Sequence, residues 1–249
     1  MGYLKAGFFA AAMILALGLP ATTQAQEGFQ NLQVLPQDIP RRNLTAVMRN
    51  FAIGLGVRCS YCHVGEEGQP LSEYDFASDE KEAKVIARDM LRMVSAINGE
   101  HLASLNVRND PPVRVNCATC HHGNNLPITL ADHLWAVFQE NGAEAVVPEF
   151  DELKTRYYGS WTYDFSEGSL NDLAATMIDA EEFDAALLVL TRNLSDYPES
   201  ARIFAAIGES YLGKADTVQA VSNLQRSLEL NPGNQAISRL LDRISGNDR

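Results

Sequence analysis

The pentapeptide pattern C-x-x-C-H occurs twice in this 249-residue chain, and it constrains the fold more than any other feature. The first copy covers residues 59–63 and the second residues 117–121, and together they use all four cysteines. Two thiols at this spacing can add to the two vinyl groups on one edge of a haem, which places the following histidine beneath the iron. We therefore predict two covalently bound haem c groups. Their attachment and proximal residues would be Cys59, Cys62 and His63 for one, and Cys117, Cys120 and His121 for the other.

The first 25 residues have the pattern of a cleaved secretory signal peptide. Lys5 is the only charged residue before Glu27, and an apolar run over residues 6–19 ends at Pro20. Small residues precede a cleavage site after Ala25, and the apolar run is shorter than the about 20 residues that span a bilayer. We expect export to the periplasm, cleavage of residues 1–25, and no membrane span in the mature chain.

Export leaves a second use of the cysteines open. In an oxidising compartment four cysteines could form disulfides. Two intact C-x-x-C-H motifs favour haem attachment over that alternative.

The composition is acidic, with 20 Lys and Arg against 32 Asp and Glu and a formal net charge of −12. Removal of Lys5 with the signal peptide leaves 19 basic residues against the same 32 acidic ones. This charge argues against nucleic acid as a partner and favours a redox partner with a basic docking face, guided by electrostatic attraction. An acidic surface that only contacts water is the alternative.

Helices are predicted on both sides of the first motif. Asn43 can cap a helix over residues 44–55, and Ser78 can start another that ends at Asn98-Gly99. A further helix is expected over residues 130–140. Four apolar residues recur at helical spacing on the helix after Ser78 and form one stripe: Ile86, Met90, Met93 and Ile97.

The C-terminal part repeats with a period of 34 residues. Residues 201–234 fit the tetratricopeptide pattern of large, small and helix-ending positions, and residues 167–200 place similar residues at the same offsets. Residues 235–244 are predicted to be a capping helix. About three repeats are usually needed for stability, so two repeats and a cap should pack against another part of the chain, most plausibly the haem module.

We predict a mainly α fold, in which a small helical dihaem c-type cytochrome module precedes an α-solenoid of tetratricopeptide repeats. The expected divisions are a signal peptide at 1–25, the dihaem cytochrome c domain at 26–141, a helical and aromatic linker at 142–163, and the repeat domain with its capping helix at 164–249. Five aromatic residues of the linker are expected to pack mainly between the domains: Phe150, Tyr157, Tyr158, Trp161 and Tyr163.

The group opposite each histidine decides what the iron can do. A sixth protein ligand makes an electron carrier, whereas an open face makes an enzyme or a sensor. Met48 lies eleven residues before Cys59, on a predicted helix that a glycine turn folds back toward the motif. Its thioether is a candidate ligand, although a helical methionine can equally be a core residue. Four arginines could pair with haem propionates: Arg41, Arg42, Arg88 and Arg114.

Several segments around the motifs match a known pattern. They are residues 44–63, which include Val47-Met48-Arg49, then residues 87–98, which run from Ala87 through Met93 to Ile97-Asn98, and residues 117–123. Over about residues 35–127 the chain resembles the tetrahaem cytochrome subunit of photosynthetic reaction centres and its smaller relatives. In that family a helix before each motif commonly provides the distal methionine. The resemblance implies Met48 as ligand of the first haem and Met90 as ligand of the second, with Met93 as the fallback.

The chain also departs from that family. It has two haem motifs where the reaction-centre subunit has four, so a role beside a photosynthetic reaction centre does not follow. The exceptional distal histidine of the family has no counterpart, because Ser104 occupies its place and His101 lies earlier.

These features favour a periplasmic dihaem electron carrier, not an enzyme, whose repeats dock it to a redox partner. One alternative is a dihaem peroxidase-like enzyme with one open iron, for which the sequence offers no convincing distal acid or base. The other is a scaffold or sensor in which the repeats dominate.

Overall fold

The structure is a computed structural model that describes residues 29–105 and 111–246, so the expected signal peptide lies outside the described residues. The described ranges are mostly helical, and their only β-type pairing is an isolated antiparallel bridge between Val64 and Asp75. The predicted mainly α fold is therefore confirmed. None of the helices in these two ranges is both long and apolar enough to cross a membrane.

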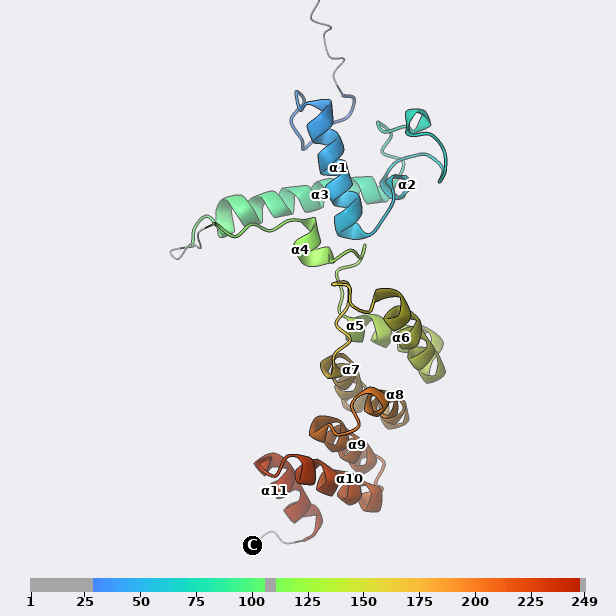
Figure 1. Cartoon of the computed structure of the whole chain (residues 1–249), viewed down its shortest axis with the longest axis vertical. Coiled ribbons are helices and arrows are strands. Elements are labelled where there is room, and N and C mark those ends of the chain that lie inside the picture. The colour runs from blue at the N-terminus through green and yellow to red at the C-terminus, as the bar shows by residue number, and fades with distance from the viewer. Residues whose placement is uncertain (1–28, 106–110, 247–249) are drawn as a thin grey trace, which may run out of the picture.

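The N-terminal half contains the two C-x-x-C-H segments and the helices that surround them (Figure 1). Its elements, in chain order, are α1 (Arg41–Leu55), α2 (Cys59–Cys62), the 3₁₀ turn η1 (Leu71–Glu73), α3 (Glu82–Ala96), the π-helical turn η2 (Ile97–His101) and α4 (Cys117–His121).

Helix α1 begins three residues earlier than expected. Pro40 occupies the N-cap position and the predicted cap Asn43 lies inside the helix, so that prediction was wrong. Proline suits this place because its missing N–H would have no partner in the first turn. The helix ends as expected, at Gly56 in a left-handed conformation with φ of 66°.

Helix α3 begins at Glu82, not at Ser78. The residues after Ser78 are held by tertiary contacts, since the carboxylate of Asp79 accepts hydrogen bonds from Arg88 of α3 at 2.7 and 3.0 Å. The predicted stop at Asn98-Gly99 is also wrong, because the chain continues through η2 to His101. Asn98 instead bonds the main chain of Val115 through both its amide oxygen and its amide nitrogen.

Residues 29–40 precede α1, and their Asn31 binds the residues at the start of α3; we call this segment the strap. Asn31 donates to the carbonyl of Ala77 and to Asp79, and its own carbonyl accepts from Arg88 at 3.4 Å. The strap is thereby fastened to the start of α3.

The C-terminal half is an array of stacked antiparallel helices, which follow one another from α5 to α11 in Figure 1. They are α5 (Leu130–Asn141), α6 (Ala143–Tyr157), α7 (Glu167–Asp179), α8 (Phe183–Asp196), α9 (Ala201–Gly213), α10 (Thr217–Leu230) and α11 (Gln235–Ile244). We call α5 to α11, with their connections, the helical array. The helix expected over residues 130–140 is confirmed by α5.

The helices of the array recur with the period expected from the sequence. Helices α7, α9 and α11 begin at Glu167, Ala201 and Gln235, each 34 residues after the one before. The small residue Gly208 is buried where α9 meets α10, and a Cβ there would lie 2.6 Å from Cγ of Leu224. The tetratricopeptide identity of the repeats stays a prediction.

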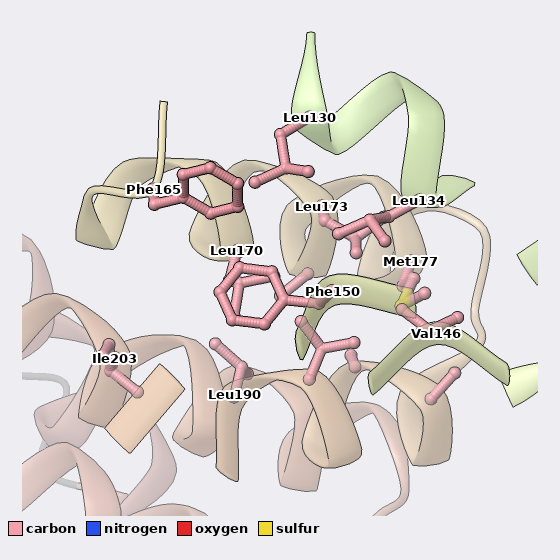
Figure 2. Packing of buried hydrophobic residues seen from close by; sticks show 14 of the residues in the cluster. Leu130, Leu134, Val146, Phe150, Phe165, Leu170, Leu173, Met177, Leu190 and Ile203 are labelled. Atoms are coloured by element: carbon pink, nitrogen blue, oxygen red, sulfur yellow. The ribbon is translucent and has the colours of Figure 1, made fainter. Parts of the chain in front are cut away.

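The expected linker contains a full helix. Helix α6 starts at Ala143 and contains Pro148 in its second turn. Val146 and Phe150 of α6 join Leu130 and Leu134 of α5 in the same buried cluster as the repeat helices (Figure 2). The pair α5 and α6 therefore gives the two repeats the additional support that they were expected to need.

Candidate haem-binding site

The first C-x-x-C-H segment is presented by a single helical turn. Helix α2 carries Cys59 and Cys62, and His63 follows it in an extended conformation. Lys81, just before α3, donates to the carbonyl of Ser60 and so holds α2 against the start of α3. A pocket opens beside Cys59, with Ala52 of α1 among its lining residues.

His63 is half-buried, and its imidazole meets the edge of the Phe76 ring at 4.9 Å between centroids. Burial lowers the pKa of His63, and the positive charges of Lys84 and Lys81 lower it further. The neutral imidazole, which is the form that ligates a metal, is thus favoured at neutral pH. Nδ1 of His63 is buried and has no hydrogen-bond partner within the described ranges.

The second segment forms helix α4, which a capping box starts. The side chain of Asn116 accepts from the backbone N–H of Thr119, whose hydroxyl accepts in return from the N–H of Asn116. His121 is the last residue of α4, and its Nδ1 lies 2.9 Å from the carbonyl oxygen of Asn124. A carbonyl can only accept, so Nδ1 carries the proton and Nε2 is left with a free lone pair. Metal-ligating histidines are commonly oriented by this kind of bond.

None of the four cysteines is paired in a disulfide, the arrangement considered as the alternative. Burial raises the pKa of both Cys62 and Cys117, which keeps these thiols protonated at neutral pH. Free thiols in C-x-x-C-H turns are the form from which haem attachment proceeds.

Each motif packs against the helix that precedes the other motif. Helix α4 lies against the C-terminal end of α1, where the N–H of Gly123 donates to the carbonyl of Gly54 at 2.9 Å. A Cβ at Gly56 would collide with the carbonyl of Gly123, so glycine is required for this approach. Since α2 contacts α3 and α4 contacts α1, the two candidate haem positions share one small module.

The candidate distal methionines lie on α1 and α3. Met48 is half-buried on α1. On α3, Met90 is 37% exposed, Met93 47% and Ile86 49%, so this stripe does not pack into a protein core. No distance here distinguishes Met90 from Met93 as a ligand, and both assignments stay predictions.

The distribution of buried residues supports the presence of a large apolar group in the N-terminal half. Across residues 29–105 and 111–246, every buried hydrophobic side chain lies at Leu130 or later. Before Leu130 the apolar side chains of α1 and α3 are exposed or half-buried. A flat apolar haem would cover such faces, and the thiols, imidazoles and thioethers provide the ligand types that haem c requires.

Arg88 and the three histidines outside the motif ligand positions, His101, His122 and His133, have other partners or lie at the surface. Arg88 is buried and its guanidinium forms an ion pair with Asp79, which also binds Asn31 of the strap. His101 is exposed in η2. His122 lies against Trp161 with ring centroids 5.5 Å apart, and Nε2 of His133 lies 2.9 Å from a carboxylate oxygen of Glu149.

The sequence did not predict that Asn124 and Tyr163 contact each other beside the second motif. Asn124 supplies the carbonyl for His121, and its side-chain amide donates to the hydroxyl of Tyr163 at 2.6 Å. The place of Asn124, three residues after His121, was the only local signal for its role. Nothing in the sequence links it to a tyrosine 39 positions later.

Comparison with known proteins identifies the family. The sequence profile of the photosynthetic reaction centre cytochrome C subunit matches residues 14–166, which is more than half of the chain. The chain belongs to this family. It is a family of c-type cytochromes, which implies covalently bound haem c. The match ends before α7, so the repeat helices lie beyond it.

Individual relatives match the same region. Cytochrome c-554 of Chloroflexus aurantiacus is 38% identical over 100 residues, covering 40% of this chain and 21% of that protein. The photosynthetic reaction center cytochrome c subunit of Thermochromatium tepidum is 32% identical over 106 residues, covering 42% of this chain and 23% of that protein. The corresponding subunit of Roseobacter denitrificans is 36% identical over 106 residues, covering 41% and 26%. The chain thus spans about a quarter or less of the length of these relatives.

Proposed function

We propose that this protein is a periplasmic dihaem c-type cytochrome that passes single electrons between protein partners. The observation that carries the proposal is the pairing, at both motifs, of free thiols on a helical turn with a half-buried histidine. Bound haem supplies an iron that cycles between its ferric and ferrous states. Cys59 and Cys62 would hold one haem, and Cys117 and Cys120 the other.

The proposed distal ligands, on the side of each iron opposite the histidine, favour electron transfer over catalysis. Met48 on α1 and Met90 on α3 are the proposed distal ligands, with Met93 as the fallback for the second haem. A thioether from Met48 or Met90 on the iron would leave no position for a substrate, as suits a carrier, and would raise the reduction potential. For the peroxidase alternative the sequence offers no convincing distal acid or base.

The helical array is proposed to be the docking part of the molecule. Residues 130–246 contain 19 acidic against 8 basic residues, whereas residues 29–129 contain 11 against 10. The negative charge is therefore concentrated on the array, where it would attract a redox partner with a basic face. On this proposal the divisions are those expected from the sequence, with the dihaem cytochrome domain at 26–141, the linker at 142–163, the repeat domain at 164–249 and the signal peptide removed after residue 25. Helices α5 and α6 pack on the repeats. A photosynthetic reaction centre is not proposed as the partner.

The spectrum of the purified holoprotein tests the ligands. We expect two low-spin haems, with the weak sulfur-to-iron band at the red edge of the oxidised spectrum. Met48→Ala and Met90→Ala should each remove about half of that band, since each would free one of two irons from its sulfur. Met93→Ala is the matched control on the same face as Met90 and should retain the band.

One result would contradict the proposed function, and another would only reassign a ligand. High-spin haem with rapid carbon monoxide binding in the untreated protein would favour an open iron. Full retention of the band in Met90→Ala with loss in Met93→Ala would move the second ligand to the fallback residue without changing the function.

A further inference from the structure

The second motif is connected to the helical array through one short chain of hydrogen bonds. It runs from Nδ1 of His121 to the carbonyl of Asn124, and from the Asn124 amide nitrogen to the hydroxyl of Tyr163. The two distances are 2.9 and 2.6 Å. His121 belongs to the cytochrome module, whereas Tyr163 belongs to the buried cluster of the array.

Tyr163, the last residue in this series of hydrogen bonds, is held in place by the packing around it. Its side chain is 8% exposed, and its ring meets the edges of Tyr157 and Phe165 with centroids 5.7 and 6.3 Å apart. Burial raises the pKa of Tyr163. The phenol therefore stays neutral at neutral pH and cannot leave its site without breaking these contacts.

Asn124 makes local hydrogen bonds through both its main chain and its side chain. Its backbone N–H donates to the carbonyl of His121 at 2.8 Å, and its side-chain oxygen accepts from the N–H of Leu126 at 3.3 Å. The amide nitrogen provides the longest-range of these contacts, because it alone reaches the array. Removing it would free the turn that carries the carbonyl in front of His121.

We propose that Tyr163 is a positioning residue for the second iron site. By holding the side chain of Asn124, it fixes the carbonyl that orients His121, so that the packing of the array sets the donor strength of this histidine. The inference rests on the proposed role of His121 as a haem ligand. It adds to that role a coupling between the array and the reduction potential of one haem.

The sign of the effect follows from the chemistry of imidazole. A hydrogen bond from Nδ1–H to a carbonyl increases the electron donation of Nε2, which stabilises ferric iron and lowers the potential. If the carbonyl of Asn124 is less firmly positioned, its hydrogen bond with Nδ1 of His121 becomes weaker. The reduction potential of the second haem should therefore rise when the hydrogen bond between Asn124 and Tyr163 is removed.

The first motif provides an internal reference, since Nδ1 of His63 has no such partner in the described part of the chain. The holoprotein can thus be titrated by spectroelectrochemistry in four forms: wild type, Tyr163→Phe, Asn124→Ala and the double variant. In both single variants we expect the midpoint potential of the same haem to rise while the other stays unchanged. The double variant should shift no further than the larger single shift, because both changes cut one link.

Tyr157→Phe is the matched control. It removes a phenol hydroxyl from a ring that packs on Tyr163 but leaves the bond to Asn124 in place. Both of its midpoint potentials should equal those of the wild type. Asn124→Ala keeps the main-chain carbonyl and lies outside the packed core, so it tests the link even if Tyr163→Phe disturbs folding.

The outcomes separate the two proposals. Two low-spin haems with unchanged midpoints in both Tyr163→Phe and Asn124→Ala would overturn the positioning role and leave the proposed function intact. A wild-type protein without haem on Cys117 and Cys120, as seen by mass spectrometry, would overturn both.

Discussion

Asp79 collects more partners than any other carboxylate near the motifs. It accepts from Arg88 at 2.7 Å, from Lys84 at 3.0 Å and from the amide of Asn31 at 2.9 Å. These hydrogen bonds lower the pKa of Asp79 far below that of an ordinary carboxyl group, with Arg88 making the largest contribution. The ionised side chain thereby joins the strap to α3.

This pKa shift predicts an acid-sensitive strap. A carboxyl group whose pKa is lower in the folded than in the unfolded state stabilises the fold above its unfolded pKa of about 3.9, and that stability is lost as the pH falls below it. We expect Asp79→Asn to reduce hydrogen-exchange protection of the strap and of the start of α3 at pH 7. The difference from the wild type should shrink toward pH 3.

Asp89→Asn is the control for this prediction. Asp89 pairs with Arg92 on the exposed side of α3, and exposed pairs of this kind contribute at most about 1 kcal/mol. Equal protection in Asp79→Asn and wild type at pH 7 would show that the strap is held by something else.

At the scale of elements, the helix pairs of the array depend on small residues at their crossings. Gly208 brings α9 close to α10, and a Cβ there would lie 2.6 Å from Cγ of Leu224, which is itself fully buried. Leu224 could move only by displacing other core residues, because interiors are closely packed.

Gly208→Ala is therefore expected to destabilise the array by about 1–3 kcal/mol, the usual cost of overpacking. Gly168→Ala is the matched control near the start of α7, where the nearest atom to a new Cβ is Oγ of Ser166 at 3.6 Å. That change should be neutral or stabilise by at most about 1 kcal/mol through helix propensity. Urea unfolding measures both, and equal stabilities of the two variants would refute the packing argument.

At the scale of the whole molecule, the two halves differ in what holds them together. The array has a continuous hydrophobic core from Leu130 to Ile207, whereas the described residues before Leu130 bury no hydrophobic side chain. The array should fold by its own packing, and the N-terminal half should depend on haem.

A variant in which all four cysteines are alanine tests this difference. Without thioether attachment we expect α1 and α3 to lose hydrogen-exchange protection, while α5 to α10 keep theirs, since the buried cluster of the array is formed by residues from Leu130 onward. Hydrogen exchange followed by mass spectrometry reports both halves at once. Protection of α1 and α3 at the holoprotein level would contradict the view that haem is their core.

Much of the fold could be predicted because its signals are local. Periodicity and small residues predicted the helices from α7 to α11, and the C-x-x-C-H spacing predicted the two candidate attachment sites. Helix starts were less predictable. Asn43 and Ser78 are good caps by residue type, but the start of α1 is set by Pro40 and the residues after Ser78 are held by contacts of Asp79 with distant residues.

The sequence by itself determined the candidate attachment chemistry, since two thiols and a histidine within five residues could meet a haem through local geometry alone. Only the tertiary structure decided that Asp79 binds both Arg88 and Asn31, that α5 and α6 join the repeat helices, and that Asn124, three residues after the second motif, reaches Tyr163. The contacts of Asp79 with Asn31 and of Asn124 with Tyr163 join side chains 48 and 39 positions apart, where pattern and spacing carry no information. Such contacts form only because packing of the helices brings those side chains together.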